Sequence, residues 1–472
     1  MERRSFFKNS SLAALGIGLS PTIGGCESII EEENLQKKAK NIIFLVSDGM
    51  SSGTLTMTDY LSSRKQGYHS HWMSLYHENR AKRALMETSS ANSIVTDSAA
   101  ASSSWGCGVR VPNGRLNVGA NDEHYEPILQ KFKNAGKAVG CVTSVPITHA
   151  TPAGFCVNNI SRGNQAEIAK QYLDLRFDVM LGGGKEYFDA SLRKDGEDVY
   201  GQFAAQGYTV AREKAELSQI HDLSKPVIGA FCESGIPYAL DHEQSEEEKK
   251  TIPTLPEMTR FAIEKMSTHN DGFVLQIEGG KVDWAAHGND IGGLLYDQLA
   301  FDECVKIAQD FAAKNDDTLV IVTTDHGNAN PGLFYGKEAN QRFDQLQEIK
   351  HTNRWVLTGI EKTSSVASII ERVEHAQGIV LSREDAALIF KHYQNLPQLE
   401  ADNTYNDYAL PFKKLAEIQN KHFNVGWAGM HHSADFVELA MTGAGSEMLP
   451  AFVKNTDLHN FMLVATGVLG VK

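Results

Sequence analysis

The chain has 472 residues, of which 42% are hydrophobic and 22% are charged, and its formal net charge is −14. This composition is ordinary for a globular protein, and the length fits either one large α/β domain with insertions or two domains. Because an acidic chain is poorly suited to the phosphate backbone of DNA or RNA, we expect no nucleic-acid partner.

The first 26 residues have the features of an export signal. Residues 3–8 (RRSFFK) resemble a twin-arginine signal, and the apolar stretch 12–19 is too short to span a bilayer. Residues 23–26 (IGGC) are typical of a lipoprotein processing site, so Cys26 is a candidate lipid anchor. Alternatively, Cys26 is incidental and cleavage falls nearby, or the signal is only of the Sec type. We therefore expect an exported protein, periplasmic or lipid-anchored to the cell envelope, with residues 27–40 as a tether before a domain over 41–472.

Apolar runs that end in turn residues predict buried strands. The first run, residues 42–46, is followed by Ser47-Asp48-Gly49, which places a carboxylate just past the carboxyl end of a strand. Further candidate strands lie at 138–143, 178–181, 227–231, 272–277 and 318–323, with helical patterns at 256–266 and 291–311. This alternation predicts an α/β fold with a largely parallel central sheet covered by helices on both faces. Glycines 182–184 lack a dinucleotide-binding pattern and indicate a turn.

Residues 96–102 (TDSAAAS) predict the start of a helix. The side-chain oxygens of Thr, Asp and Ser accept hydrogen bonds from the free N–H groups of a first turn. A nucleophilic Ser98 at this place would lie at the positive end of the helix dipole, which favours an incoming phosphate. The alternative is a capped, alanine-rich helix that packs tightly and has no further role.

Carboxylates and histidines follow the two later strands. Asp283 and His287 are four residues apart, which on a helix places both side chains on one face and suits two ligands of one zinc ion. An exposed helical pair that binds no metal is the alternative. Asp325 and His326 come directly after the strand at 318–323, where a capping Asp beside a solvated His is the alternative.

Together these motifs resemble those of the alkaline phosphatase family. The resemblance covers residues 41–472, and the matching segments are VSDGM (46–50), VTDSAA (95–100), THATPAGF (148–155) with Arg162, EGGKVD (278–283) with His287, and TTDHG (323–327). As a set they are specific, although no single motif is. The resemblance implies a metal-dependent enzyme that hydrolyses small phosphate monoesters through a phosphoserine at Ser98, releases inorganic phosphate, and forms a homodimer.

The resemblance also implies two Zn²⁺ ions and one Mg²⁺ ion. The implied ligands are Asp283, His287 and His432 for the first zinc, Asp48, Ser98, Asp325 and His326 for the second, and Asp48, Thr151 and Glu278 for magnesium. Nitrogen-rich sites suit zinc, and all-oxygen sites suit magnesium. Arg162 matches the residue that binds two phosphate oxygens, and Asp97 is expected to orient it. For the first zinc we choose His432 over His431 because its spacing to the strand near Val437 fits the family better.

Three features depart from the family pattern. His149 stands where some members have Asp near the magnesium, and Trp284 where some have Lys or His in contact with phosphate. These two positions leave the third metal open, so zinc or another divalent ion is conceivable there. The segment 330–426 is long for the family and has helical patterns at 364–374 and 383–392. It is expected to be an enlarged crown over the site, part of a dimer interface, or a surface insertion.

Two other functions stay open at this point. Related metal hydrolases of the same broad fold act on diesters, sulfates or sugar phosphates, although Arg162 together with the third metal site argues for monoesters. A lipid-anchored protein that binds metal or phosphate without turnover is the other alternative. The presence of Ser98 and of a full set of ligands argues against it.

Overall fold

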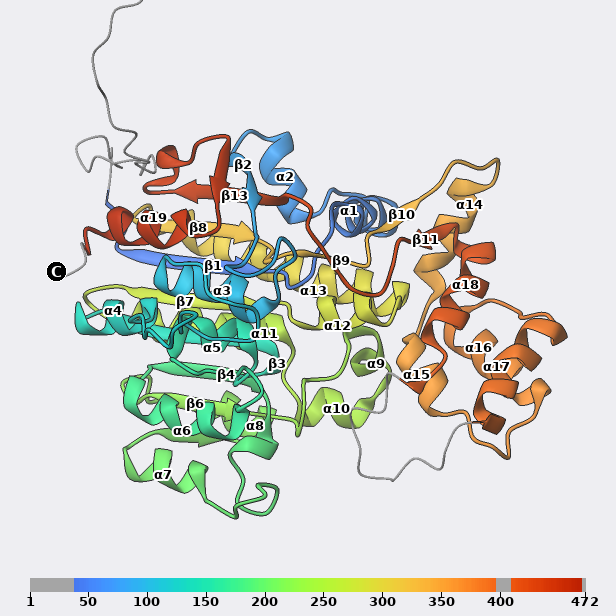
Figure 1. Ribbon diagram of the computed structural model, residues 1–472, viewed down its shortest axis with the longest axis horizontal. Coiled ribbons are helices and arrows are strands. Elements are labelled where there is room, and N and C mark those ends of the chain that lie inside the picture. The colour runs from blue at the N-terminus through green and yellow to red at the C-terminus, as the bar shows by residue number, and fades with distance from the viewer. Residues whose placement is uncertain (1–37, 396–408, 469–472) are drawn as a thin grey trace, which may run out of the picture. The chain divides into compact units, whose positions relative to one another are not determined.

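A ten-stranded sheet forms the centre of the computed structural model, which describes residues 38–395 and 409–468 (Figure 1). The predicted export signal, Cys26 and residues 27–37 of the predicted tether lie outside the described residues. The strand order is β14-β2-β13-β8-β1-β7-β3-β4-β6-β5. The strands are β1 (Asn41–Val46), β2 (Lys82–Glu87), β3 (Ala138–Pro146), β4 (Val179–Gly183), β5 (Thr209–Ala211), β6 (Val227–Ala230), β7 (Phe273–Glu278), β8 (Thr318–Thr323), β13 (Val437–Gly443) and β14 (Phe452–Lys454).

The sheet is mixed but largely parallel, as predicted. From β8 to β5 every neighbouring pair is parallel, whereas β13 runs antiparallel to both β8 and β2. Every residue of β1, β3, β7 and β8 is buried, which explains why these strands are continuous apolar runs rather than alternating ones. All six predicted strands are present, with ends shifted by up to three residues.

The prediction of a turn over glycines 182–184 is correct only for Gly184, which has a φ of +94°. Gly182 and Gly183 still belong to β4. A Cβ atom on Gly183 would lie 2.0 Å from the carbonyl oxygen of Ser234. These glycines therefore allow a close approach between two backbone segments inside the sheet layer.

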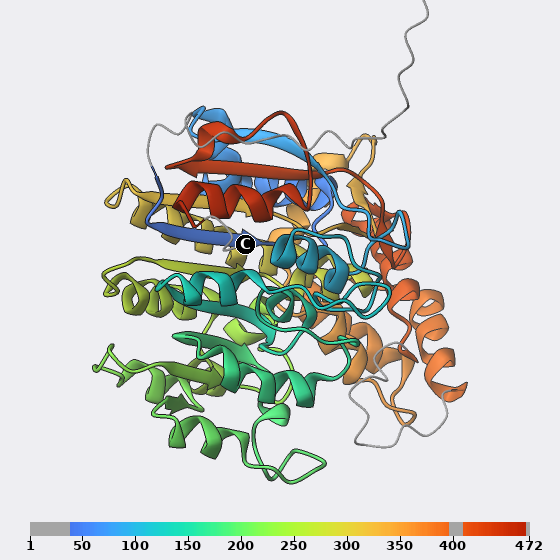
Figure 2. The same ribbon diagram turned by 60° about the vertical axis from the view of Figure 1, so that its left-hand side comes forward.

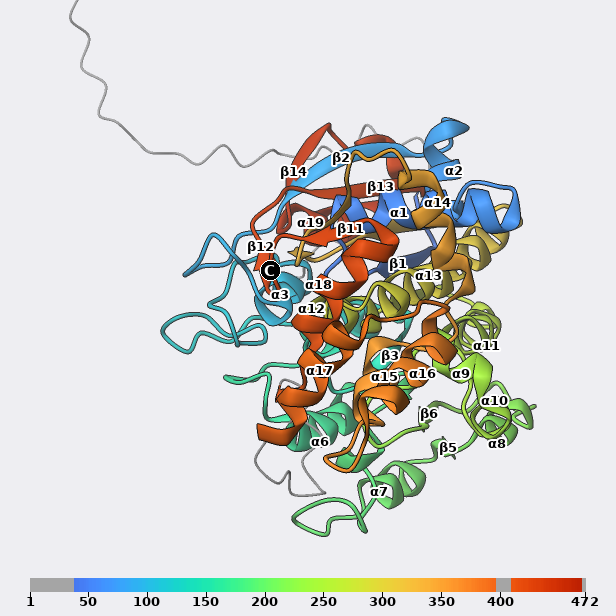
Figure 3. The ribbon, with the colours of Figure 1, turned by 90° about the vertical axis from the view of Figure 1, so that its right-hand side faces the viewer.

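Helices cover both faces of the sheet, as predicted. In Figure 3, α1, α11 and α13 lie on one side of the strands, and α3 and α19 lie on the other. Figure 2 brings the second face forward, with the red helix α19 and the blue helix α3 in front of the strands. The first layer contains α1 (Ser52–Gln66), α2 (His71–His77), α11 (Leu255–Ser267) and α13 (Ile291–Ala312), and the second contains α3 (Ser98–Cys107), α4 (Ile128–Asn134), α5 (Ala150–Cys156) and α19 (Asp457–Thr466).

The other helices and short strands connect or extend these layers. They are α6 (Gln165–Leu175), α7 (Val199–Ala205), α8 (Lys214–Ser218), α9 (Ala239–Gln244), α10 (Glu246–Thr251), α12 (Lys281–His287), β9 (Gly327–Asn328), β10 (Pro331–Leu333), β11 (Val425–Trp427) and β12 (His432–Ser433). Of the helices in the described ranges, none combines the length and the apolar character needed to cross a bilayer.

The described part of segment 330–426 is mainly helical. It contains α14 (Ala339–Asp344), α15 (Asn353–Thr358), α16 (Val366–Gln377), α17 (Arg383–Asn395) and α18 (Phe412–Phe423), which include the two helical patterns expected there. In Figure 1 these helices lie together on the right, beyond the ends of the central strands. A hydrogen bond of 2.7 Å from the Asn353 N–H to Asp290 Oδ2 connects α15 to the start of α13.

Candidate active site

The three central strands β8, β1 and β7 are direct neighbours, so the residues at their carboxyl ends meet at one edge of the sheet. Asp48 lies two residues after β1, Glu278 is the last residue of β7, and Asp325 lies two residues after β8. All three side chains are fully buried. Asp48 Oδ1 and Glu278 Oε1 have no hydrogen-bond partner within the described part of the chain. Buried polar groups are normally paired, so these two oxygens are suited to bind a cation.

Asp48, Asp325 and His326 form a fully buried group next to Ser98. Their candidate ligand atoms lie within 4.8 Å of one another. His326 Nε2 is 3.1 Å from Asp325 Oδ2 and 3.6 Å from Asp48 Oδ1. The same nitrogen is 3.2 Å from Ser98 Oγ. The structure therefore brings Ser98 together with all three residues that the sequence analysis grouped with it.

Ser98 begins helix α3, as the sequence predicts. Asp97 is the N-cap residue, and its Oδ1 accepts a hydrogen bond of 3.0 Å from the Ala100 N–H. The small residues behind Ser98 allow α3 to pack closely against α5: a Cβ atom on Gly154 would lie 2.3 Å from Ser102 Oγ. Ser102 Oγ also donates a hydrogen bond of 2.6 Å to the carbonyl oxygen of Thr151. This packing fixes the start of α5 beside the start of α3.

Asp283, His287 and His432 form a second group. The first two lie one turn apart on α12, with His287 Nε2 at 3.4 Å from Asp283 Oδ2. His432, in β12, places its Nε2 3.6 Å from Asp283 Oδ1 and 3.1 Å from His287 Nε2. The ring of His431 lies 6.3 Å from that of His287, and His431 is not part of the group. The structure thus brings His432, rather than His431, to Asp283.

Backbone carbonyl groups fix the orientation of both histidines in this second group. His287 Nδ1 is 2.7 Å from the Met430 carbonyl oxygen, and His432 Nδ1 is 2.9 Å from the Thr96 carbonyl oxygen. A ring that donates its Nδ1–H to a carbonyl has a free lone pair on Nε2, which is the usual arrangement of a metal-binding histidine.

A third group surrounds the other side of Asp48. Thr151 Oγ1 donates a hydrogen bond of 3.1 Å to Asp48 Oδ2, and Thr143 Oγ1 donates one of 2.5 Å to Glu278 Oε2. Asp48, Glu278 and His149 can also bring one ligand atom each within 4.8 Å of one another. Thr151 and Glu278 therefore meet Asp48 as expected, and His149 adds a nitrogen atom to an otherwise oxygen-rich group.

The guanidinium group of Arg162 contacts two residues, Asp97 at the start of α3 and His149. One guanidinium nitrogen is 3.2 Å from Asp97 Oδ2, and the other is 3.1 Å from His149 Nε2. Asp97 Oδ2 also accepts a hydrogen bond of 2.9 Å from the Gly114 N–H. Trp284 packs edge-on against His149, with 6.1 Å between the ring centroids. The structure thus brings the expected pair Asp97 and Arg162 together and adds His149 to it.

Burial governs the pKa values of the carboxyl groups in this region. Burial and the neighbouring Asp325 carboxylate raise the pKa of Asp48 well above its ordinary range, and burial raises the pKa of Glu278 to about 7. Burial also acts on Asp283, but its electrostatic interactions with the neighbouring His287, His432 and His326 outweigh burial and hold its pKa below the ordinary range. Several like charges in a water-poor space repel one another unless cations are present.

The pKa values of two histidines in the site are lowered. Burial and the Arg162 guanidinium lower the pKa of His149 to about 3, and burial and His326 lower the pKa of His432 to about 4. Both rings are therefore neutral at neutral pH, which is the form that binds a metal ion or accepts a hydrogen bond from arginine.

The residues present fit divalent cations. Two groups combine histidine nitrogen with carboxylate oxygen, a donor set that suits zinc, and the third combines carboxylates with a threonine hydroxyl, which suits magnesium. A fourth group, Asp59, His69 and His77, lies mostly exposed near α1 and α2, and the sequence analysis did not single it out.

Two supporting contacts were missed by the sequence analysis. Thr143 binds Glu278 as described above, and Asn328 Nδ2 donates a hydrogen bond of 2.7 Å to Asp283 Oδ1. Asn328 stands three residues after Asp325. Its position close to that motif was the available signal in the sequence. Its contact with Asp283 joins residues 45 apart in the chain, which no local pattern predicts.

Comparisons with known proteins agree with this arrangement. A model of the alkaline phosphatase family matches residues 39–468. Alkaline phosphatase 4 of Bacillus subtilis is 30% identical, and the alignment covers 99% of this chain and 100% of that protein. Alkaline phosphatase 3 of the same organism is 28% identical over 90% of this chain and 88% of that protein. The crystal structure of Thermus thermophilus alkaline phosphatase superposes with a TM-score of 0.85 at 31% identity, covering 92% of this chain and 93% of that one. The chain therefore belongs to the alkaline phosphatase family of metal-dependent phosphomonoesterases.

Proposed function

We propose that this chain hydrolyses phosphate monoesters through a phosphoserine formed on Ser98. The observation that carries the proposal is the position of the Ser98 hydroxyl, which lies at the N-terminus of α3 and 3.2 Å from His326 Nε2, against the buried group of Asp48, Asp325 and His326. A free serine hydroxyl is a weak nucleophile, so its activation has to come from this group.

We propose three divalent cations, two Zn²⁺ and one Mg²⁺. The first zinc would be held by Asp283, His287 and His432, the second by Asp48, Asp325, His326 and Ser98, and the magnesium by Asp48, Thr151 and Glu278. When bound, such ions lower the pKa of a coordinated hydroxyl or water and stabilise the negative charge of the entering and leaving oxygens. The nitrogen of His149 near Asp48 and Glu278 makes zinc or another divalent ion the alternative at the third site.

The proposed reaction has two steps, in which the phosphoryl group is transferred first to Ser98 and then to water. Ser98 Oγ forms a bond to phosphorus while the bond between phosphorus and the alcohol oxygen breaks, and the alcohol leaves with a proton. Water then cleaves the phosphoserine, which releases inorganic phosphate and restores the Ser98 hydroxyl. The N–H groups at the start of α3 favour the negative charge that gathers on the phosphoryl oxygens during both steps.

Arg162 binds and orients the phosphoryl group in this proposal. Its planar guanidinium can donate to two phosphoryl oxygens at once, which a lysine cannot do. Asp97 and the neutral His149 accept hydrogen bonds from it at 3.2 and 3.1 Å and so keep its side chain in one orientation. Asp97 is thereby both the cap of α3 and the positioning partner of Arg162.

The remaining expectations are proposals about the whole protein. We propose that residues 1–26 direct export to the periplasm, with Cys26 as the candidate lipid anchor, and that residues 27–40 are a tether. We propose further that the domain spans 41–472, that the protein is a homodimer, and that segment 330–426 is a crown over the site. The features of residues 3–8 and 23–26 support export, and the position of α14–α18 beyond the central strand ends supports the crown.

The test compares two substrates with the metal content measured on the same sample. Purified protein loaded with zinc and magnesium is assayed on p-nitrophenyl phosphate and on bis-p-nitrophenyl phosphate, and bound metals are counted by mass spectrometry. We expect kcat/KM for the monoester to exceed that for the diester by at least about 100-fold, a loss of more than about 2.7 kcal/mol for the diester. A preference for the diester, or metal binding without turnover of either ester, would contradict the proposal.

A further inference from the structure

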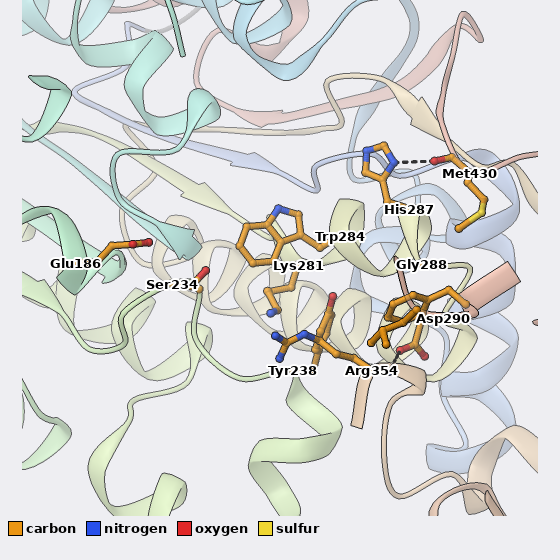
Figure 4. A pocket seen from close by; sticks show the side chains of 13 residues that line it. Glu186, Ser234, Tyr238, Lys281, Trp284, His287, Gly288, Asp290, Arg354 and Met430 are labelled. Atoms are coloured by element: carbon orange, nitrogen blue, oxygen red, sulfur yellow. Dashed lines mark hydrogen bonds between the residues drawn. The ribbon is translucent and has the colours of Figure 1, made fainter. Parts of the chain in front are cut away.

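A cavity of about 210 Å³ lies directly beside the candidate active site. Its lining comes from the segments that follow β4 and β6, from helix α12 and the residues after it, from segment 330–426, and from Met430. In Figure 4, His287 and Trp284 lie at the top of the cavity, with Lys281, Tyr238 and Arg354 below them. A cavity of about 150 Å³ is enough to hold benzene, so this cavity has room for one ring-sized group.

The cavity shares a wall with the candidate metal site. His287 lines the cavity, and its Nε2 is 3.1 Å from that of His432 in the group around Asp283. Met430, whose carbonyl oxygen is 2.7 Å from His287 Nδ1, lines the cavity as well. Trp284 lines the cavity and also packs against His149, the partner of Arg162. The cavity is therefore directly adjacent to the group of Asp283, His287 and His432, and His287 belongs to both.

The direction of the proposed reaction points the alcohol part of the substrate toward this cavity. In phosphoryl transfer the entering and leaving oxygens lie roughly in line on opposite sides of phosphorus. Ser98 lies against the group of Asp48, Asp325 and His326. The leaving oxygen therefore faces the group to which His287 belongs, and the rest of the alcohol continues past His287.

The cavity contains a buried lysine that faces aromatic rings. Lys281 is 5% exposed, and its Nζ is 3.7 Å from the centroid of the Tyr238 ring and 4.7 Å from that of Trp284. Within the described ranges, no carboxylate oxygen lies within the 4 Å of an ion pair with Lys281. Asp290 also lines the cavity, but its oxygens accept hydrogen bonds from the Gly293 and Asn353 N–H groups.

Cation–π contacts and the attraction of the more distant Asp297 and Asp241 carboxylates offset only part of the cost of burying Lys281. A cation–π contact stabilises by about 0.5–2 kcal/mol, whereas removing an ammonium group from water costs several kcal/mol. The Arg354 side chain, from α15, lines the same part of the cavity and adds a second positive charge. Glu186 lines one end of the cavity, on the left in Figure 4. An anionic group near Lys281 would therefore be stabilised in this cavity.

We propose that this cavity binds the alcohol part of the substrate and selects phosphomonoesters whose alcohol is about one ring in size and carries an anionic group, which Lys281 binds. The inference rests on the proposed function, because it uses the direction in which the alcohol leaves. It adds a substrate class to that function, and it assigns Lys281 a role in specificity.

The test uses two esters that differ in one charge. Para-carboxyphenyl phosphate and para-carbamoylphenyl phosphate have nearly the same size, and only the first has an anionic group on its ring. The kcat/KM values of both esters are measured near neutral pH on the metal-loaded wild type, on Lys281→Met and on Lys281→Gln. We expect the wild type to favour the carboxylate ester by about tenfold, and both variants to lose this preference, which corresponds to about 1.4 kcal/mol.

A second buried lysine provides the matched control. Lys265 on α11 is also 5% exposed, but its Nζ donates a hydrogen bond of 2.9 Å to the Leu223 carbonyl oxygen, and it does not line the cavity. Lys265→Met should keep the wild-type ratio of the two esters. Equal loss of the ratio in Lys265→Met and Lys281→Met would overturn the inference, because the effect would then not be specific to the cavity.

Binding of the two alcohols separates this inference from the proposed function. Para-hydroxybenzoate and para-hydroxybenzamide are titrated into wild type and Lys281→Met by calorimetry. We expect the wild type to bind the benzoate about tenfold more tightly, and Lys281→Met to bind both alike. Turnover of both esters with no charge preference in rate or binding would overturn the inference and leave the proposed function intact. Charge-selective binding of the alcohols without turnover of either ester would support the cavity and contradict the proposed function.

Discussion

Buried polar side chains occupy two regions of this molecule, and they are satisfied in opposite ways. At the strand ends, Asp48 and Glu278 each have one carboxylate oxygen without a hydrogen-bond partner among the described residues. In segment 330–426, the amides of Asn353, Gln377 and Gln419 bind one another: Asn353 Oδ1 accepts hydrogen bonds of 2.7 and 2.6 Å from the two glutamines, and Gln377 Oε1 accepts one of 2.7 Å from Gln419.

This difference distinguishes a ligand-binding site, at the strand ends, from a part of the fold that needs no ligand, in segment 330–426. Neutral amides that satisfy one another stabilise one arrangement of the helices α15, α16 and α18 and need nothing further. Clustered carboxylates destabilise the fold on their own, because burial and mutual repulsion both oppose their charge. Bound cations offset this repulsion, so changes in the two regions should have opposite effects on activity and stability.

The largest effect is expected from Asp48→Asn, since Asp48 belongs to two of the candidate metal groups. With metals supplied, kcat/KM should fall by at least about 100-fold, as when a main source of charge stabilisation is removed. After chelation, the variant should unfold at a higher temperature than chelated wild type, because one of several repelling carboxylates is gone. Activity assays and calorimetry measure the two effects. If the chelated variant unfolds at a lower temperature than chelated wild type, the expected contrast between the two regions is wrong.

Arg162→Lys should have the next largest effect. The loss of one charge-assisted hydrogen bond and of the planar fork should lower kcat/KM by about 10- to 100-fold, corresponding to about 1.5–3 kcal/mol. Inhibition by inorganic phosphate should weaken in parallel, because the same oxygens are bound. Steady-state kinetics with phosphate as inhibitor measures both. A change below about threefold in both would show that Arg162 does not bind the phosphoryl group.

Gln419→Leu should affect stability and leave activity almost unchanged. It removes a donor from both Asn353 Oδ1 and Gln377 Oε1, which should lower the free energy of unfolding by about 1–3 kcal/mol. The neighbouring Asn420 is exposed, so Asn420→Leu is the control on the same helix. Urea titrations and kcat/KM are compared for both variants. Unchanged stability with lost activity in Gln419→Leu would assign the network to the site rather than to the fold.

The last expected effect is a loss of stability with rising pH in the metal-free protein. Burial raises the folded-state pKa of Glu278 to about 7, above its ordinary 4.5. The folded state therefore keeps this proton up to a higher pH than the unfolded state does. Stability is lost as the pH rises from the ordinary pKa to the folded-state pKa, by at most about 1.4 kcal/mol per pH unit. Chelated Glu278→Gln should lack this loss. Urea titrations of both proteins across the window measure it, and parallel curves would contradict the assignment.

The centre of the sheet could be predicted from the sequence because parallel strands buried on both faces are continuous apolar runs. β1, β7 and β8 and the carboxylates that follow them were found in this way. The strands β14 and β2, the outermost two on one side of the sheet, were missed, because only part of each is buried. A strand near Val437 was expected, but the antiparallel direction of β13 was not, since local sequence does not record strand direction.

The site residues that belong to the sequence motifs could be predicted, whereas those outside the motifs could not. The resemblance chose His432, which the structure places beside Asp283, whereas a pair of adjacent histidines by itself gives no reason to prefer one. Thr143 and Asn328 could not be found, because each meets its partner across a distance along the chain that no spacing rule covers. The cavity around Lys281 combines residues from Glu186 to Met430 and has no local pattern at all.

Trapping of a phosphoenzyme tests the central claim most directly. Metal-loaded wild type, Ser98→Ala and Ser104→Ala are each incubated with labelled phosphate monoester and quenched with acid, and the label is located by peptide mass spectrometry. Ser104 is the control because its hydroxyl only donates to the Ala100 carbonyl oxygen within α3. We expect wild type and Ser104→Ala to carry the phosphoryl group on Ser98, and Ser98→Ala to carry none. A covalent phosphoryl group that persists in Ser98→Ala, or that lies on another residue in wild type, would contradict the account.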